Sequence, residues 1–366
     1  MLPENSSIDR LLPWLRLAQT PGIPLRRQHE LLSAFGTPDA LQRTHPAELR
    51  ERCGDAIADC LQSGPHARAM AATMRWLESP AHRVVTLADA EYPQRLLQIS
   101  DPPLVLYAVG RVELLNAPAI AMVGSRNASP QGSKDAEAFA EALSSAGLCV
   151  VSGMALGIDA AAHRGALRAA GSSVAVLGTG PEAIYPRRNR ALAQALAEGG
   201  CLVTEFAPGT PLAAANFPRR NRLISGMSLG VWVIEAAPGS GSLITARFAL
   251  EQNRDVFAMP GSIHSPLSKG CHHLIRSGAR LAEKAQDVIE ELGWKGMMLS
   301  VPAESGPVAA DPVLDALGFD PLSIDQVAER CGMDVPALCA RMSALELEGR
   351  VVSLPGGRLQ RVARGP

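Results

Sequence analysis

The sequence contains no long apolar segment, few aromatic residues and no excess of either charge. Aromatic residues make up 4% of the 366 residues, charged residues 19%, and the formal net charge is −1. The N-terminus lacks a basic segment followed by an unbroken apolar one, and no uncharged stretch is long enough to span a bilayer. We therefore expect no membrane contact and a cytoplasmic location. The neutral total does not exclude a polyanionic partner, because such a partner responds to local clusters of arginine.

The sequence also lacks the motifs of several common sites. Its seven cysteines are scattered without a CxxC pair, which argues against a disulfide framework or a zinc ribbon. There is no GxxxxGK[ST] motif of an ATPase and no GxSxG nucleophile elbow. Cys271, His272 and His273 are adjacent, so on a helix their side chains point apart and no metal site is indicated. We expect no cofactor, no metal and no catalytic residues.

One stretch imitates a dinucleotide fingerprint. Residues 178–183 read GTGPEA after an apolar run, but Pro181 opposes the helix that a GxGxxG/A motif should open. An ordinary turn at the end of a strand is the better interpretation. Asp159 lies four residues before His163, so the two side chains could face one another on a helix. The simpler interpretation is that Asp159 caps or braces its own helix.

Residues 1–78 show a helical pattern. The sequence PGI at 21–23 separates two amphipathic stretches, and Thr37 with Pro38 has the order of an N-cap and a first helical position. This pattern is typical of a SAM-like or helix-hairpin-helix module, which often contacts DNA backbones. A small helical bundle without a ligand explains it equally well.

In residues 79–298 the spacing of apolar residues changes from a helical pattern to short continuous runs. Short apolar runs, among them AIAMV, LCVVSG, SVAVLG and LGVWVIEA, alternate with helical stretches. Near-continuous apolar strands that alternate with helices indicate a mostly parallel sheet covered on both faces. We predict an α/β, Rossmann-like doubly wound fold for this part of the chain.

Residues 299–312 are rich in proline, alanine and glycine and are predicted to be a linker. In residues 313–366, the sequence SIDQ at 323–326 predicts a capping box, a second helix follows Gly332, and two short runs flank the turn PGG. This order predicts a winged helix. Its second helix carries Arg341 but also Glu346 and Glu348, a charge pattern that favours packing or protein contacts over sequence-specific DNA recognition.

Several strand-end loops are rich in glycine, serine or arginine. In an open parallel sheet ligands bind at the carboxyl ends of the strands, and glycine and serine at a helix N-terminus expose N–H groups to phosphate. Several such loops at one edge suit a chain of phosphates. The residues we expect to contribute in this way are Gly124, Ser125, Ser152, Gly153, Ser240 and Gly241.

Positive charge is most concentrated in FPRRNRLISG, residues 217–226, which we predict to be the end of a loop before the next strand. Arginine can hold phosphate oxygens with two donors, and Phe217 offers a face on which any base can stack. Asn221 can bind a base edge. The alternative is that the arginines only solvate a loop while Phe217 fills the core, and this alternative has most weight for Arg220.

The loops together resemble a known family. AMVGSRNAS, VSGMALGIDAAAH, AVLGTGPEAIYPRRN, FPRRNRLISGMS, VIEAAPGSGSLITARFALEQNRDVFAMPG and SKGCHHLIRSGA are similar, in order and spacing, to the signature blocks of the DNA-processing protein A family (DprA, Smf). The resemblance implies a non-enzymatic protein that binds single-stranded DNA without sequence preference and forms a homodimer through its Rossmann-like domain. It also implies that the protein protects incoming strands and loads the RecA recombinase onto them during natural transformation.

The resemblance also implies site residues. The residues matching the family's DNA-binding pocket are Gly124, Ser125, Arg126, Phe217, Arg219, Asn221, Arg222 and Lys269, with Arg187 as a further phosphate contact. The rival hypothesis is a nucleotide hydrolase, because the Rossmann-like part also resembles LOG-type phosphoribohydrolases. Their PGGxGTxxE motif supplies a catalytic acid, whereas this chain reads PGSGSLITA and lacks the glutamate. A third possibility is an interaction scaffold whose end modules dock partners.

Overall fold

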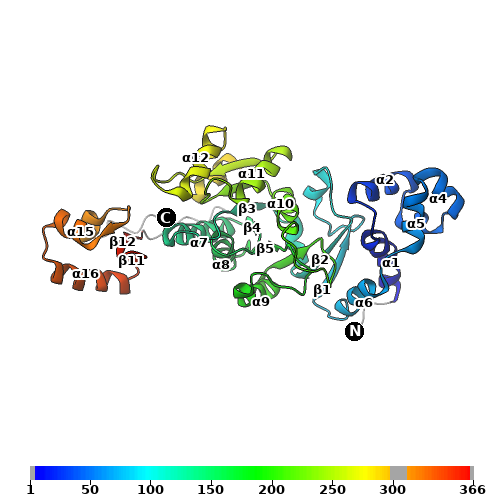
Figure 1. Cartoon of the computed structure of the whole chain (residues 1–366), viewed down its shortest axis with the longest axis horizontal. Helices are drawn as coiled ribbons and strands as arrows, with labels where there is room; N and C mark the ends of the chain where they lie inside the picture. The colour runs from blue at the N-terminus through cyan, green and yellow to red at the C-terminus, as the bar shows by residue number, and fades with distance from the viewer. Residues whose placement is uncertain (1–4, 297–310, 363–366) are drawn as a thin grey trace.

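The structure, a computed structural model, describes residues 5–296 and 311–362. It places a helical N-terminal part beside a large mixed sheet, and a small helical and β-hairpin unit follows at the C-terminal end (Figure 1). No helix among the described residues is long and apolar enough to cross a membrane.

The N-terminal part consists of short helices. They are α1 (Asn5–Gln19), α2 (Leu25–Phe35), α3 (Pro38–Arg43), α4 (Pro46–Cys53), α5 (Asp55–Ser63) and α6 (Ala67–Trp76). Thr37 caps α3 by accepting a hydrogen bond from the N–H of Ala40, and Pro38 is the first residue of the helix, as predicted. The helices share one hydrophobic core with Val84, Val105 and Tyr107 of the first two strands. They therefore cover the outer end of the sheet.

The central sheet has nine strands in the order β1-β2-β6-β5-β4-β3-β7-β8-β9. The strands are β1 (His82–Thr86), β2 (Val105–Gly110), β3 (Ala119–Val123), β4 (Cys149–Ser152), β5 (Ser173–Val176), β6 (Cys201–Thr204), β7 (Gly230–Val233), β8 (Asp255–Ala258) and β9 (Arg280–Leu281). β1 and β2 are antiparallel, and the strands from β6 to β9 in this order are parallel. The predicted Rossmann-like, mostly parallel sheet is confirmed. β9 was not expected, because two exposed residues give no apolar run.

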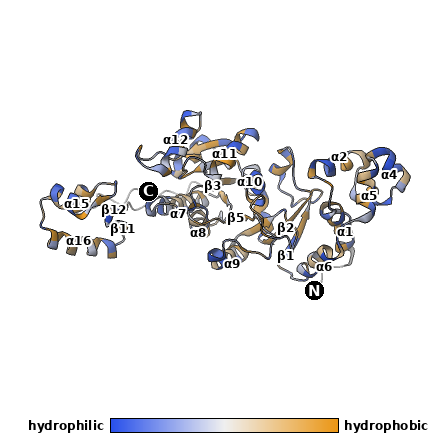
Figure 2. Ribbon diagram, in the orientation of Figure 1, coloured by the Kyte–Doolittle hydropathy of each residue, from blue (hydrophilic) through white to orange (hydrophobic). Residues whose placement is uncertain are grey.

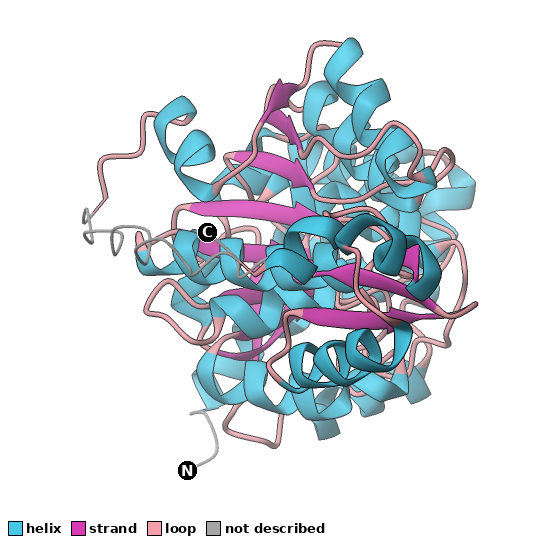
Figure 3. Cartoon of the chain, turned by 90° about the vertical axis from the view of Figure 1, so that its left-hand side faces the viewer, coloured by secondary structure: helices cyan, strands magenta, loops and turns pink. Residues whose placement is uncertain are grey.

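Helices cover both faces of the sheet (Figure 3). They are α7 (Pro130–Ser145), α8 (Ile158–Ala166), α9 (Arg190–Gly199), α10 (Asn216–Gly226), α11 (Gly241–Glu251), α12 (Lys269–Arg276) and α13 (Ala285–Glu291), with single-turn helices η1 (Gln94–Gln98), η2 (Val112–Asn116), η3 (Arg187–Asn189) and η4 (Pro266–Ser268). Side chains alternate along β3: Ala121 and Val123 pack with α10, α11 and α12, whereas Ile120 and Met122 pack with α7 and α8. Hydrophobic residues accordingly gather along the strands (Figure 2).

The segment 217–226, predicted to be a loop, is instead part of the helix α10. That prediction was wrong because a cluster of charge before an apolar run does not exclude a helix, and Pro218 lies in the first turn of α10. Proline is tolerated in the first turn, where the N–H groups have no partner within the helix. Residues 178–183 form bends and turns without a helix start, as expected for the GTGPEA stretch.

The C-terminal unit contains α14 (Pro312–Leu317), β10 (Leu322–Ser323), α15 (Ile324–Cys331), α16 (Val335–Leu347), β11 (Val351–Leu354) and β12 (Arg358–Arg361). The capping box of Ser323 and Gln326 is present, and Gly332 ends α15 in the left-handed conformation. The unit has its own hydrophobic core. The predicted linker lies outside the described residues except for Asp311, which caps α14, and Pro312, its first residue.

Candidate nucleic-acid interface

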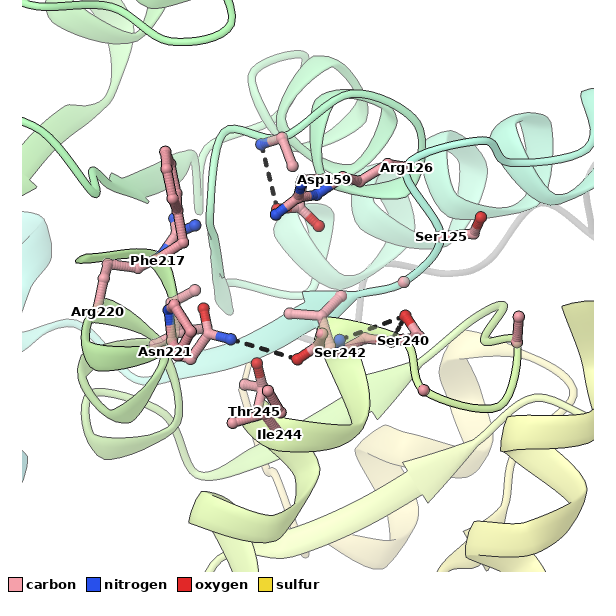
Figure 4. A pocket seen from close by; sticks show the side chains of 18 of the residues that line it. Ser125, Arg126, Asp159, Phe217, Arg220, Asn221, Ser240, Ser242, Ile244 and Thr245 are labelled. Carbon is pink, nitrogen blue, oxygen red and sulfur yellow. Dashed lines mark hydrogen bonds between the residues drawn. The ribbon is translucent and has the colours of Figure 1, made fainter. Parts of the chain in front are cut away.

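A cavity of about 450 Å³ opens at the carboxyl ends of the parallel strands. Its walls come mainly from the loop after β3, the first turns of α10, and the loop that leads into α11. In Figure 4, Phe217 and Asn221 stand across from Arg126, and Ser240 and Ser242 form the remaining side. The predicted site residues that line the cavity are Gly124, Ser125, Arg126, Phe217, Asn221, Ser240 and Gly241.

The loop after β3 is held by a carboxylate of the protein itself. Glu235, just beyond β7, accepts hydrogen bonds from the N–H and the hydroxyl of Ser129, at 2.9 and 2.5 Å. Ser129 in turn caps α7 by accepting a bond from the N–H of Gly132 at 2.9 Å. A Cβ atom at Gly132 would lie 2.4 Å from the Glu235 carboxyl carbon, so the Glu235 carboxyl group packs directly against the backbone of Gly132. Burial raises the pKa of the Glu235 carboxyl and the two bonds from Ser129 act to lower it, and this carboxyl group already occupies the positive end of α7.

The N-terminus of α11 faces the cavity, and its first turn contains no acidic residue. Ser240 caps the helix and accepts a hydrogen bond from the N–H of Ser242. A Cβ atom at Gly241 would meet no atom within 4 Å, so the backbone there is open to a ligand. Asn221 donates to the carbonyl of Gly241 at 3.3 Å and ties this turn to α10. The exposed N–H groups and the helix dipole favour an anion such as phosphate.

Phe217 is a half-buried ring at the edge of the cavity. Its centroid lies 5.5 Å from that of Tyr185, and the Arg126 guanidinium carbon lies 6.0 Å from the Phe217 ring centroid. A Cβ atom at Gly178 would come within 2.7 Å of the ring, so only glycine leaves room for it. The ring is held in place and keeps an accessible face on which a base can stack.

Arg220 forms part of the inner wall of the cavity. The guanidinium donates to the carbonyls of Gly153 and Val176, and the residue is 4% exposed. Burial lowers the pKa of Arg220 to about 10, and the carboxylate of Asp159 acts in the opposite direction. Asp159 accepts hydrogen bonds from the N–H groups of Gly153 and Ala155, both at 3.2 Å, so it holds the turn that precedes α8, whereas the sequence predicts that it braces the helix itself. Arg220 is thus a buried structural cation.

Arg219 and Arg222 lie on a different side of α10 from the cavity. Both donate to the carboxylate of Glu205, at 3.0 and 2.5 Å, and Arg222 also contacts the carboxylate of Asp101 at 3.2 Å. Burial raises the pKa of the Glu205 carboxyl, while the two guanidiniums act to lower it. Both arginines border a second groove of about 530 Å³, whose lining includes Asp101 and Glu251.

Other predicted contacts also lie outside the cavity. Ser152 is buried and donates to the carbonyl of Met122, and Gly153 is buried behind the cavity wall. Arg187 is exposed in η3. Lys269 is exposed at the start of α12, which is anchored next to the α11 loop by a hydrogen bond from the N–H of Gly270 to the carbonyl of Ala236, at 2.7 Å. Their contact with DNA stays a prediction.

Sequence reasoning missed Tyr185, Glu205 and the wall position of Asp159. Tyr185 precedes the arginines of residues 187–190, and an aromatic beside a basic cluster was the available signal. Glu205 directly follows β6, at the edge where polar side chains gather. The Cys271 thiol is buried, His272 contacts the carbonyl of Gly261, and no group of three potential metal ligands occurs in the described parts of the chain.

The fold and the cavity define a Rossmann-like protein with an open cavity at the carboxyl ends of its parallel strands. Its sequence contains no GxxxxGK[ST] motif, and no helix starts at its GTGPEA stretch. Residues 83–293 match the family model of DNA recombination-mediator protein A, and residues 300–357 match that of the DprA winged helix domain. The chain belongs to the DprA/Smf family.

Named relatives cover most of the chain. It is 42% identical to protein Smf of Escherichia coli K12 over 306 residues, which are 80% of this chain and 82% of that protein. It is 45% identical to DNA processing protein DprA of Streptococcus pneumoniae R6 over 206 residues, 56% of this chain and 73% of the relative.

Two solved structures are also similar. The X-ray structure of DprA from S. pneumoniae has a TM-score of 0.68 at 34% identity and covers 76% of this chain and 97% of that chain. A solved structure of DNA processing protein A from Helicobacter pylori, studied for its single-stranded DNA binding mode, has a TM-score of 0.53 at 29% identity and covers 57% of this chain and 95% of that chain.

Proposed function

We propose that this protein binds single-stranded DNA without sequence preference and loads a RecA-type recombinase onto it during natural transformation. The observation that carries the proposal is the cavity shared by the loop after β3, the first turns of α10 and the start of α11. It brings together the guanidinium of Arg126, the ring of Phe217 and the open N-terminus of α11, with the buried Arg220 in its inner wall. These groups suit a phosphate and a stacked base and do not read a base sequence.

The comparisons support the proposal. DNA processing protein A from H. pylori, which binds single-stranded DNA, shares the fold over 57% of this chain. The family model that matches residues 83–293 is that of a recombination mediator. We further propose that the protein acts in the cytoplasm as a homodimer formed through the Rossmann-like part, protects the bound strand and catalyses no reaction.

Oligo-dT binding measured by fluorescence anisotropy over a series of salt concentrations tests the site. We expect Arg126→Ala to weaken binding and to reduce the slope of log K against log salt by about 0.7, the value for one lost phosphate contact on a single strand. Arg83→Ala is the matched control, because Arg83 is an exposed arginine on the edge strand β1. An unchanged affinity and slope for Arg126→Ala would place the strand elsewhere.

The hydrolase alternative is tested with the same preparation. The first acidic residue of α11 is Glu251, at its C-terminal end and far from the glycine turn along the helix. We therefore expect no release of free base from nucleoside monophosphates. Measurable turnover would contradict a purely binding role.

A further inference from the structure

We propose that Glu205 is a positioning residue for strand binding. Its buried carboxylate holds α10 through Arg219 and Arg222, so that another side of the helix presents Phe217 and Asn221 to the cavity. This inference rests on the proposed function and concerns residues behind the binding surface. It assigns to Arg222 a role in fixing α10, in place of the phosphate contact predicted from the sequence.

Both terminal nitrogens of the Arg222 guanidinium donate hydrogen bonds, and Nε is buried next to a carboxylate without a hydrogen bond of its own. One terminal nitrogen donates to Glu205 at 2.5 Å, the other donates to the carbonyl of Asp101 at 2.7 Å, and Nε lies 3.2 Å from the Asp101 carboxylate. The side chain is 5% exposed and that of Glu205 is 2% exposed. A buried guanidinium with this many partners would have to leave two carboxylates to meet a phosphate, at a large cost in electrostatic energy.

The helix periodicity separates the two groups of side chains. Phe217, Arg220 and Asn221 are three to four residues apart and line the cavity, whereas Arg219 and Arg222 are three apart and line the second groove. A rotation of α10 that brought Arg222 toward the strand would carry Phe217 away from it. The two sets therefore face different sides of α10.

The two carboxylates Glu205 and Asp101, with the arginines of α10 that they bind, form what we call the clamp. It connects α10 to parts of the chain that are distant in sequence. Asp101 precedes β2, Glu205 follows β6, and Gln252 at the end of α11 donates to the carbonyl of Arg222 at 3.0 Å. Arg219 reaches the same Glu205 oxygen and lies 5.4 Å from the ring centroid of Phe206. Phe217 sits in the first turn of α10, so these contacts set its position relative to Arg126.

The variant Glu205→Gln tests whether Arg222 fixes α10 or contacts phosphate, because the two roles predict opposite changes in oligo-dT affinity. If Glu205 positions α10, oligo-dT binding weakens by roughly tenfold, about the loss of one base stack, while the salt slope stays that of the wild type because no phosphate contact is lost. If the arginines contact phosphate, removal of the competing carboxylate frees them, and binding becomes tighter with a steeper slope. The second result would overturn the proposal.

Glu251→Gln is the matched control. Glu251 is an exposed carboxylate that lines the second groove and makes no ion pair with α10 among the described residues. It reports the general effect of removing one negative charge near the groove, and we expect less than a twofold change in affinity, as for an exposed, solvent-screened charge. A weakening as large as that of Glu205→Gln would also contradict the clamp.

Urea unfolding of each variant shows whether the fold is kept. If Glu205→Gln does not fold, Asp101→Asn tests the same contacts, because the Asp101 side chain is 42% exposed and the change weakens its contact with Nε of Arg222, beside a long hydrogen bond from the neighbouring Ser100 hydroxyl at 3.4 Å. Weaker binding at unchanged slope supports the clamp, and tighter binding overturns it. Failure of the wild-type protein to bind oligo-dT would instead contradict the proposed function itself.

Discussion

Asp135 shows how burial alters a single ionisable side chain. It lies on α7, is 5% exposed, and accepts one hydrogen bond from the side chain of Gln131 at 2.6 Å. Burial raises the pKa of Asp135 to about 6, the Gln131 bond acts to lower it, and the nearby Glu235 raises it further. Because the unfolded pKa is near 3.9, the folded protein binds this proton more tightly than the unfolded chain. The resulting stability is present below pH 4 and is lost as the pH rises through 6.

Asp135→Asn should therefore stabilise the protein at pH 8 by about 2 kcal/mol and have little effect at pH 4. The free energy of unfolding in urea, measured for both proteins at both pH values, checks this. Burial lowers the pKa of His163 to about 3, which reduces stability in acid as the pH falls below its unfolded pKa of about 6.5. That effect is common to both proteins and cancels. A gain of equal size at both pH values would contradict the assignment.

For the arginines of FPRRNR, the sequence predicts a cluster of charge but not the direction in which each side chain points. The sequence indicates that charge gathers at this edge, and Arg126, Phe217 and Asn221 do line one cavity. It does not show which arginine faces outward, because that depends on the phase of α10 and on the distant partners Glu205 and Asp101. Only the folded chain separates the buried Arg220 and Arg222 from the exposed Arg219.

At the scale of elements, α7 and α8 pack at very close range. A Cβ atom at Gly165 of α8 would lie 1.9 Å from the carbonyl oxygen of Glu137 on α7. The obstacle is backbone within a helix, so it cannot move aside as a flexible side chain would. Arg164 and Arg168 pair with Glu137 on the surface of the same contact.

We expect Gly165→Ala to lower the free energy of unfolding by about 3 kcal/mol, because overpacking must push the two helices apart. Gly241→Ala is the matched control, since its new Cβ meets open space and its φ is not positive. Urea denaturation of the two variants provides the measurement. Equal stability of both variants would show that α7 and α8 can separate without cost.

The alternation of strands and helices, and most of the caps, could be predicted from the sequence. The parallel strands from β3 to β8 are apolar and largely buried, and Thr37 and Ser323 act as N-caps where expected. The helix α10 could not be predicted in the same way. Its first turn contains Pro218 and its N-cap side chain makes no hydrogen bond, so tertiary contacts decide its conformation.

At the scale of the whole molecule, the two ends of the chain relate differently to the sheet. The N-terminal helices share their core with Val84, Val105 and Tyr107, and Gln19 donates to the hydroxyl of Tyr107 at 2.9 Å. The C-terminal unit buries its own core, which includes Leu338 and Leu345. The N-terminal helices are therefore tied to the sheet through a shared core, whereas the C-terminal unit has a core of its own.

We predict that deletion of residues 299–366 leaves the oligo-dT affinity within about twofold, because the cavity lies wholly in the central part. Deletion of residues 1–78 should cause aggregation, since it exposes the apolar side chains of β1 and β2. Size-exclusion chromatography and anisotropy of both truncated proteins check these outcomes. A soluble, binding-competent protein without the N-terminal helices would contradict the shared core.

The carboxylate at the start of α7 has a consequence for competition inside a cell. A cell contains far more free dinucleotides and nucleoside triphosphates than single DNA strands, and a vacant glycine-rich turn beside a helix N-terminus would be filled by them. At the N-terminus of α7 this place is taken by the Glu235 side chain, which is held there by two hydrogen bonds from Ser129. Free nucleotides are therefore kept from the N-terminus of α7, and at the open N-terminus of α11 they would have to compete with any longer ligand that also reaches Arg126 and Phe217.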